Sequence, residues 1–448
     1  MRDDTTGTGG ASVGGSRRRF LATVGSGVAA ASVAGCIGGG EDTVHIGAVF
    51  WTSGVAEVLG AASEASARVG VRAVNEAGGI LDRDVEMTLL DHQGDADRAS
   101  RNIQDLVQED EAAGVIGLTS SGVTLSTASA VKELGVPFTL TDIGTPYITE
   151  QDYDTYGSYY EDEPPAAAGI DNLFRLNANT SINCYAMARY AHEELDEIDR
   201  VANLGPNYAY GQQCWDYFKA YADGLGADFE YVASEFPDLG AGDMTPQINS
   251  VMDAEPDLVF TSFWGGDVTT FVQQADEQGL FDQVEDVFDT IGAAPGNFAQ
   301  LGDTIPRGLH FSAWYWHSAF DNDANKRYLD LFQDEYGDDD TVYDVPSFTG
   351  ASTYASIWMY KQAMEQAGST EFGDVVDELS GMTFEDDPRG SVTFSEHNQA
   401  EAPTVIGEIS DDDDVPYDGP GLSPTRTYTL DRSTATDLLE GSGLPPGV

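Results

Sequence analysis

The segment from Val44 to Ile80 reads VHIGAVFWTSGVAEVLGAASEASARVGVRAVNEAGGI. Its first residues, up to Phe50, form a short apolar run that is typical of a buried strand. Residues 61–77 have the apolar spacing of an amphipathic helix, and Gly78-Gly79 follows at the point where such a helix ends. A buried strand followed by a helix is the repeating unit of parallel α/β sheets.

The alternation of strand and helix continues along the chain, in two separate runs. Strands are expected over 85–91, 115–118 and 137–141, and helices over 95–109 and 123–134. An acidic surface loop is expected over 150–168, and a second alternating run begins near residue 173. Two separate runs in a chain of this length predict two doubly wound, three-layer α/β/α lobes.

The first 35 residues have the features of an export signal. Arg17 and Arg18 precede an apolar stretch that is too short to span a bilayer of roughly 30 Å, and Val-Ala-Gly leads into Cys36. This resembles a twin-arginine signal that ends at a lipoprotein cleavage site. We therefore expect a lipid on Cys36, a flexible tether over 36–42, and a location on the extracellular face of the cell membrane.

The composition is strongly acidic. The chain has 77 Asp and Glu against 21 Lys and Arg, a net charge of −56, and only four lysines. Folded chains of this kind resemble those of salt-loving archaea, and the charge makes nucleic acids poor partners. We expect a monomer that loosens in low salt, because charge repulsion is screened only at high ionic strength.

Neither catalysis nor metal binding is indicated by a motif. No nucleophile elbow, zinc-protease helix or phosphate loop occurs, and the six histidines are scattered, so we expect neither an enzyme nor a cofactor. Cys184 and Cys214 could pair in an exported protein, although two buried thiols are the favoured interpretation.

Polar and aromatic residues follow the expected strands. In doubly wound sheets, ligands bind beyond the carboxyl ends of the strands, near helix N-termini that favour a carboxylate. Plain helix capping and core packing are the alternatives for any single residue. The candidate ligand-binding residues are Trp51, Ser53, Ser120, Ser121, Asp142, Gly144, Thr145, Tyr208, Tyr210, Trp264, Asp267 and Trp314.

An ordered set of these residues resembles the leucine/isoleucine/valine-type substrate-binding proteins. The set includes Thr52-Ser53-Gly54, Asn75-Glu-Ala-Gly-Gly-Ile80, Tyr210-Gly211 and Gly390–Phe394. The resemblance covers about residues 43–400 and implies a type I periplasmic-binding fold with a three-crossing hinge. Lobe one would be 43–178 with 312–391, and lobe two would be 179–311 with 392–448.

The resemblance also implies roles for residues. Ser121 and the main chain around Asp142 and Gly144 would hold a ligand carboxylate or amide, and Tyr210 would close from the second lobe. The family's acidic residue for a ligand ammonium is absent from the stretch 291–294, Ile-Gly-Ala-Ala. Asp267 or Asp142 could replace it; otherwise the ligand is an amide, a urea-like molecule or an apolar carboxylate.

Two further departures concern single side chains. Gly144 stands where the family often has Thr, and Leu59 stands at a usual aromatic position. The resemblance implies the solute-binding component of an ATP-driven (ABC) uptake system, which works with a separate membrane permease and ATPase. A sensory receptor domain for a separate signalling partner is the alternative function. An exported hydrolase is less favoured, because the sequence shows no nucleophile–base pair.

Overall fold

The computed structural model describes residues 43–159, 170–195, 198–337, 345–411 and 415–448. Arg17, Arg18, Cys36 and the predicted tether 36–42 lie outside these residues, as do residues 160–168 of the expected surface loop. Within the described ranges, no helix combines the length and the apolarity that crossing a membrane requires.

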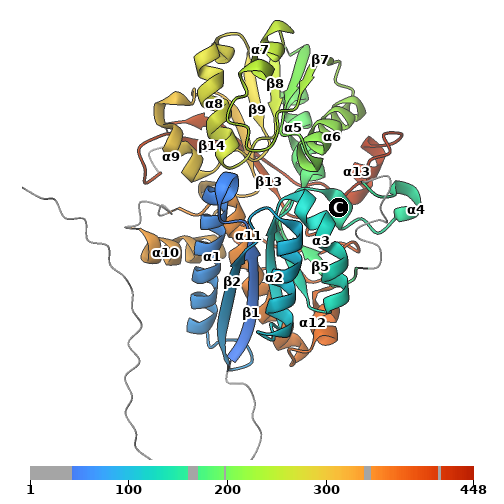
Figure 1. Cartoon of the computed structure of the whole chain (residues 1–448), viewed down its shortest axis with the longest axis vertical. Helices are drawn as coiled ribbons and strands as arrows, with labels where there is room; N and C mark the ends of the chain where they lie inside the picture. Colours follow the sequence, from blue (N-terminus) through green and yellow to red (C-terminus); the bar gives the residue numbers. More distant parts are fainter. Residues whose placement is uncertain (1–42, 160–169, 196–197, 338–344, 412–414) are drawn as a thin grey trace, which may run out of the picture. The chain divides into compact units, whose positions relative to one another are not determined.

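The first lobe is built on a five-stranded sheet in which all neighbouring strands are parallel (Figure 1). Side chains of β1 alternate between two cores, since Ile46, Ala48 and Phe50 pack with α1 and α11 whereas Val49 packs with α2 and α3. Both faces of the sheet are therefore covered. The strand order is β2 (Asp84–Asp91), β1 (Thr43–Phe50), β3 (Gly114–Thr119), β4 (Phe138–Asp142) and β5 (Leu173–Arg175). The helices are α1 (Glu57–Glu76), α2 (Ala96–Gln108), α3 (Ser121–Leu134), α10 (Asp323–Tyr336), α11 (Phe348–Ala367) and α12 (Phe372–Leu379).

The second lobe is built on a seven-stranded sheet with five parallel strands and an antiparallel pair at one edge. The order is β14 (Gly421–Tyr428), β13 (Thr404–Ser410), β10 (His310–Ala313), β9 (Asp286–Asp289), β8 (Leu258–Thr261), β6 (Arg200–Leu204) and β7 (Glu230–Glu235). Helices α5 (Thr180–Glu194) and α6 (Ala209–Leu225) pack together, and α7 (Thr245–Asp253), α8 (Gly266–Gln278) and α9 (Pro295–Leu301) form a second group. Shorter elements include α4 (Tyr153–Tyr156), α13 (Arg432–Leu438), the hairpin of β11 (Thr383–Phe384) with β12 (Val392–Thr393), and several single turns of 3-10 helix.

Three segments connect the two sheets. Residues 176–179 follow β5, residues 314–322 join β10 to α10, and residues 394–403 join β12 to β13. We expected crossings near 178, 311 and 392; β10 keeps residues 310–313 in the second sheet, so the middle connection begins after Ala313. The first and third connections lie side by side, because Arg175 pairs with Gln399 in a β-bridge.

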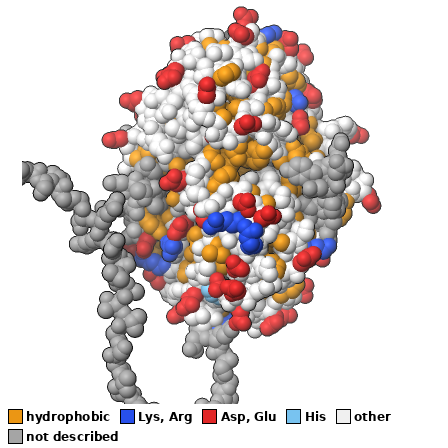
Figure 2. Space-filling view, in the orientation of Figure 1, with side chains coloured by type: hydrophobic (Ala, Val, Ile, Leu, Met, Phe, Trp, Pro, Cys, Tyr) orange, Lys and Arg blue, Asp and Glu red, His pale blue; other side chains and the backbone are white. Residues whose placement is uncertain are grey.

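Acidic side chains are scattered over the visible face of the molecule, with few basic ones among them (Figure 2). Several of the basic side chains form ion pairs with nearby acids. Arg72 on α1 pairs with Glu76 of its own helix and with Asp334 and Glu335 of α10, at distances of 2.6–2.9 Å. Exposed pairs of this kind each contribute little, about 1 kcal/mol or less, so they do not offset the repulsion of a net charge of −56.

Candidate functional site

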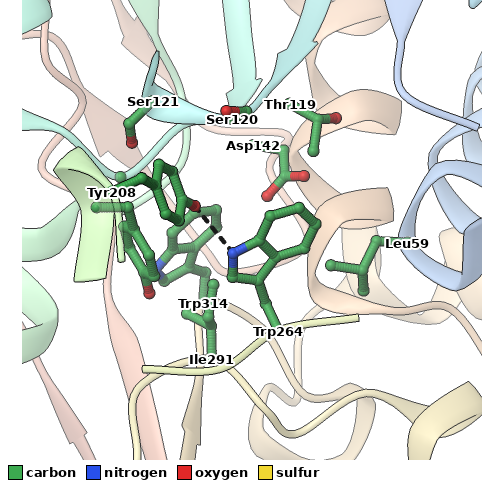
Figure 3. A pocket seen from close by; sticks show the side chains of 11 residues that line it. Leu59, Thr119, Ser120, Ser121, Asp142, Tyr208, Trp264, Ile291 and Trp314 are labelled. Carbon is green, nitrogen blue, oxygen red and sulfur yellow. Dashed lines mark hydrogen bonds between the residues drawn. The ribbon is translucent and has the colours of Figure 1, made fainter. Parts of the chain in front are cut away.

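A pocket with an empty volume of about 280 Å³ opens at the carboxyl ends of β3 and β4 (Figure 3). Residues of both lobes form its wall. They are Leu59, Thr119, Ser120, Ser121, Asp142 and Gly144 from the first lobe, Tyr208, Tyr210, Trp264 and Ile291 from the second, and Trp314 from the middle connection.

The N-terminus of α3 forms one end of the pocket. Ser120, its N-cap, has φ 84° and ψ 118°, a conformation that is costly for a residue other than glycine, and its side chain does not cap the helix. The buried Ser121 hydroxyl accepts a hydrogen bond from the Thr145 amide (3.1 Å), which leaves its proton for another acceptor. Free first-turn amides, the helix dipole and this hydroxyl together suit an anionic group.

Asp142 is the only ionisable carboxyl group among the residues that line the pocket. It ends β4, its exposed fraction is 7 %, and burial raises its pKa well above the usual range for a carboxyl group. A raised pKa means that the pocket does not solvate the carboxylate as water would. Asp142 can therefore pair with a ligand cation, or take a proton and donate a hydrogen bond.

Aromatic side chains form the opposite wall. The indole nitrogen of Trp264 donates to the hydroxyl of Tyr208 (2.9 Å), and this bond fixes both rings at the pocket (Figure 3). The Tyr210 hydroxyl is hydrogen-bonded to Thr290 (2.8 Å). The Tyr210 ring fills the space beside Gly144, where an added Cβ would lie 2.5 Å from two ring atoms. The departure from Thr at position 144 thus has a steric reason.

The loop after β9 holds an acid that does not face the pocket. Asp289 accepts hydrogen bonds from the Thr261 hydroxyl (2.5 Å) and from the main-chain amides of Ile291 (3.0 Å) and Gly292. Burial raises the pKa of Asp289 to about 6, and these hydrogen bonds oppose the rise. The carboxylate therefore shapes the loop, while Ile291 presents an apolar side chain to the pocket.

The structure brings eight of the twelve candidate residues into the pocket wall. The four that do not line it are Trp51, Ser53, Thr145 and Asp267. Trp51 lies against the Trp264 ring (centroids 5.8 Å apart), so it supports the wall from outside. The Asp267 carboxylate accepts a hydrogen bond from the Gly240 amide (2.9 Å). Thr145 is buried beside the pocket, and its amide donates to the Ser121 hydroxyl. Ser53 precedes a short 3-10 helix.

Three lining residues were not among the candidates, namely Leu59, Thr119 and Ile291. Thr119 is the last residue of β3, so the strand-end rule that selected Ser120 could also have found it. Leu59 and Ile291 are apolar side chains at positions where the resemblance implied an aromatic and an acidic residue. An apolar side chain does not by itself indicate a binding site, so the sequence did not single out Leu59 or Ile291.

Comparison with known proteins agrees with this geometry. The sequence model of a family described as periplasmic binding protein matches residues 43–414. The Leu/Ile/Val-binding protein homolog 4 of Brucella abortus is 23% identical over 420 residues, which cover 90% of this chain and 94% of that protein.

Solved structures with the same fold include a solute-binding protein of an ABC transporter and a leucine-binding protein. The solute-binding protein from Rhodopseudomonas palustris BisB5, in complex with 3,4-dihydroxybenzoic acid, has a TM-score of 0.73 at 19% identity and covers 87% of this chain and 98% of its own. A leucine-binding protein from Thermotoga maritima has a TM-score of 0.70 at 18% identity and covers 86% and 98%. These similarities show a type I periplasmic-binding fold. With the family match over most of its length, the chain belongs to the periplasmic binding protein family.

Proposed function

We propose that this chain is the solute-binding component of an ABC uptake transporter. It is a binding protein and not an enzyme, as its family membership indicates. The observation that supports the proposal best is a small pocket whose wall comes from both lobes, with Gly144 and Tyr210 in contact across it. A ligand held there would stabilise the closed arrangement and be delivered to a separate permease and ATPase.

We also propose that the lobes follow the expected division, 43–178 with 312–391 and 179–311 with 392–448, with the middle boundary moved to the end of β10 and the last boundary moved past β12. The three connections between the sheets support this division.

The ligand that we propose is a small amino acid with an apolar side chain. Its carboxylate would bind at Ser121 and the first turn of α3, and its ammonium would pair with Asp142. The apolar part would lie against Trp264 and Trp314. Burying Asp142 is costly unless a cation or a proton compensates its charge, and an ammonium group does so. The curated relatives, named as Leu/Ile/Val-binding protein homologs, support this ligand class.

Aromatic carboxylates are the second candidate. The binding proteins of Rhodopseudomonas palustris were solved with benzoate and with hydroxybenzoates, and tyrosine and tryptophan rings line the pocket here. With such a ligand, Asp142 would be protonated and would donate a hydrogen bond.

A thermal-shift screen in molar salt tests both candidates. The panel contains branched-chain amino acids, benzoates, amides and urea. A ligand at about a hundred times its Kd should add about 2.7 kcal/mol to the free energy of unfolding. If no member of the panel shifts the melt, the proposed ligand classes are wrong.

The pH dependence of binding separates the two candidates. An amino acid requires ionised Asp142, so its affinity should fall as the pH is lowered through the raised pKa of Asp142. An aromatic carboxylate should show the opposite dependence, because it requires protonated Asp142. Asp142→Asn should remove the pH dependence in both cases, and its persistence would contradict the assigned role of Asp142.

We propose export by the twin-arginine route and anchoring by a lipid on Cys36. The sequence around Arg17, Arg18 and Cys36 supports this. Cys36→Ser should release a ligand-competent protein into the medium, and replacement of Arg17 and Arg18 by Lys should block export. A Cys36→Ser protein that stays bound to the membrane would contradict the anchor.

A further inference from the structure

Arg175 is a buried cation without a described carboxylate partner. It ends β5, and its exposed fraction is 0 %. Its guanidinium donates to the Thr145 carbonyl, to the Thr149 hydroxyl (2.7 Å) and to the side-chain carbonyl of Gln399. Burial lowers the pKa of Arg175 to about 9, so the group stays cationic at neutral pH. A buried charge that is held only by neutral acceptors is costly.

Two of the acceptors belong to the segment that lines the pocket. We call residues 143–149 the pocket loop; it contains Gly144, which lines the pocket, and Thr145, whose amide binds Ser121. Arg175 binds this loop at Thr145 and Thr149, on both sides of Pro146. The bonds of Arg175 therefore contribute to holding the loop in its position beside α3.

The third acceptor belongs to the hinge. Gln399 lies in the connection 394–403, and its amide nitrogen donates to the carbonyl of Asn177 (3.0 Å) in the connection 176–179. Its carbonyl oxygen also accepts from the side chain of Asn179 (3.2 Å). Arg175 is thus bonded at one end to the pocket loop and at the other to a group that joins two of the three connections.

The first connection also binds the pocket loop directly. The side chain of Asn177 donates to the carbonyl of Ile143 (3.0 Å) and accepts from its amide (3.3 Å). Next to this connection, the amide of Thr180, the first residue of α5, donates to the carbonyl of Gly144 (2.8 Å). A shift of the pocket loop would therefore strain or break its hydrogen bonds to residues 177 and 180.

We propose that Arg175 is a positioning residue that couples the pocket loop to the hinge. Contact of a ligand with the loop at Gly144 then changes the lobe arrangement through Arg175 and Gln399. A guanidinium is suited to this role because its planar fork donates in several fixed directions, whereas a lysine ammonium is a compact point charge. The effect on ligand binding rests on the proposed function; the effect on the pocket loop does not.

Hydrogen exchange tests the coupling without a ligand. In molar salt, the backbone amides of residues 143–145 and 147–149 should exchange faster in Arg175→Met than in the unaltered protein. Arg389→Met is the matched control, because Arg389 is also buried but is bonded to Asp387 and Ser352, away from the pocket. It should leave exchange in the pocket loop unchanged. Wild-type exchange of the loop in Arg175→Met would overturn the proposal.

A milder variant covers the case in which Arg175→Met does not fold. Thr149→Val removes a single acceptor of Arg175, and it should accelerate exchange of the pocket loop to a smaller extent. Arg175→Lys keeps the charge but not the fork, so it should resemble Arg175→Met in the loop. If Arg175→Lys restores wild-type exchange, charge alone explains the role of Arg175 and the proposed geometry is wrong.

Binding measurements test the functional part, with isoleucine and 4-hydroxybenzoate as probes. By calorimetry, Arg175→Met should raise the Kd of the bound probe by about tenfold or more, since it releases the loop that contacts the ligand. Arg389→Met should lower the melting temperature with an unchanged Kd. Equal Kd values for Arg175→Met and the unaltered protein would contradict the coupling. If the unaltered protein binds neither probe, the proposed ligand fails, and hydrogen exchange still decides the role of Arg175.

Discussion

Replacing Gly144 by alanine should hold the two lobes apart. A Cβ at this position would lie 2.5 Å from two atoms of the Tyr210 ring and 2.8 Å from the Thr180 hydroxyl oxygen. Favourable carbon contacts need about 3.5–4.0 Å, so the ring would have to retreat by roughly 1 Å. Overpacking of this kind costs about 1–3 kcal/mol, and here the cost applies to the closed arrangement. The Kd of the ligand should rise roughly five- to 150-fold.

Gly122→Ala is the matched control. Gly122 also lies beside the pocket, but a Cβ there would have its nearest neighbours at 3.9 Å and 4.0 Å, which is ordinary contact. Calorimetry should therefore find a nearly unchanged Kd for Gly122→Ala and a raised Kd for Gly144→Ala. Adding Tyr210→Ala to Gly144→Ala should remove the difference that Gly144→Ala makes. If Gly144→Ala binds as tightly as the unaltered protein, Tyr210 does not close onto Gly144 in the bound state.

Four further predictions concern stability and the pocket wall. Circular dichroism in about 50 mM salt should show loss of structure relative to molar salt, because the Debye length grows from about 3 Å to more than 10 Å; identical spectra would contradict the acidic-surface argument. Burial raises the pKa of Asp267 and of Asp289 to about 6, so the folded protein binds these two protons more tightly than the unfolded chain does. The stabilisation of the folded protein by this proton binding is complete below the unfolded pKa and is lost as the pH rises through 6. Between acidic and neutral pH, the melting temperature should thus fall less in Asp267→Asn and Asp289→Asn than in the unaltered protein. If it falls equally in all of them, these two acids do not cause the pH dependence of stability. Trp264→Ala should abolish the ligand-induced thermal shift, and a retained shift would return this ring to a purely structural role. Cys184 and Cys214 are buried free thiols, so alkylation should be slow in the native protein and fast after unfolding; rapid native labelling would contradict their burial.

The strand–helix alternation predicted the lobes well because each buried strand is a short apolar run with a helix after it. The antiparallel strands β13 and β14 gave a weaker signal. In β14, GLSPTRTY, polar residues and a proline interrupt the run, and five of its eight residues are exposed or half-buried. Such an edge strand depends on pairing with β13, which lies beside β10, a partner far away in the sequence. Local sequence does not contain that information.

The strand-end rule predicted the position of the pocket, but side-chain direction limited it. Ser121 and Asp142 were found because the ends of parallel strands and the following helix starts meet at one edge. Asp267 satisfies the same rule in the first turn of α8, yet its carboxylate binds the Gly240 amide. Trp51 also follows a strand and packs behind Trp264. Spacing places a residue at an edge, whereas its contacts depend on loops whose geometry comes from the whole fold.

The burial of Asp142 links proton binding to closure of the lobes. Asp142 belongs to the first lobe, and Trp264 of the second lobe lines the same pocket opposite it (Figure 3). Separation of the lobes would hydrate Asp142 and return its pKa toward the usual range, so the closed form binds a proton more tightly than the open form. In the absence of ligand, lowering the pH should therefore favour closure, and Asp142→Asn should favour it at every pH. Small-angle scattering in molar salt measures this as a decrease in the radius of gyration. A radius of gyration that does not change with pH in the unaltered protein would contradict this link between proton binding at Asp142 and closure of the lobes.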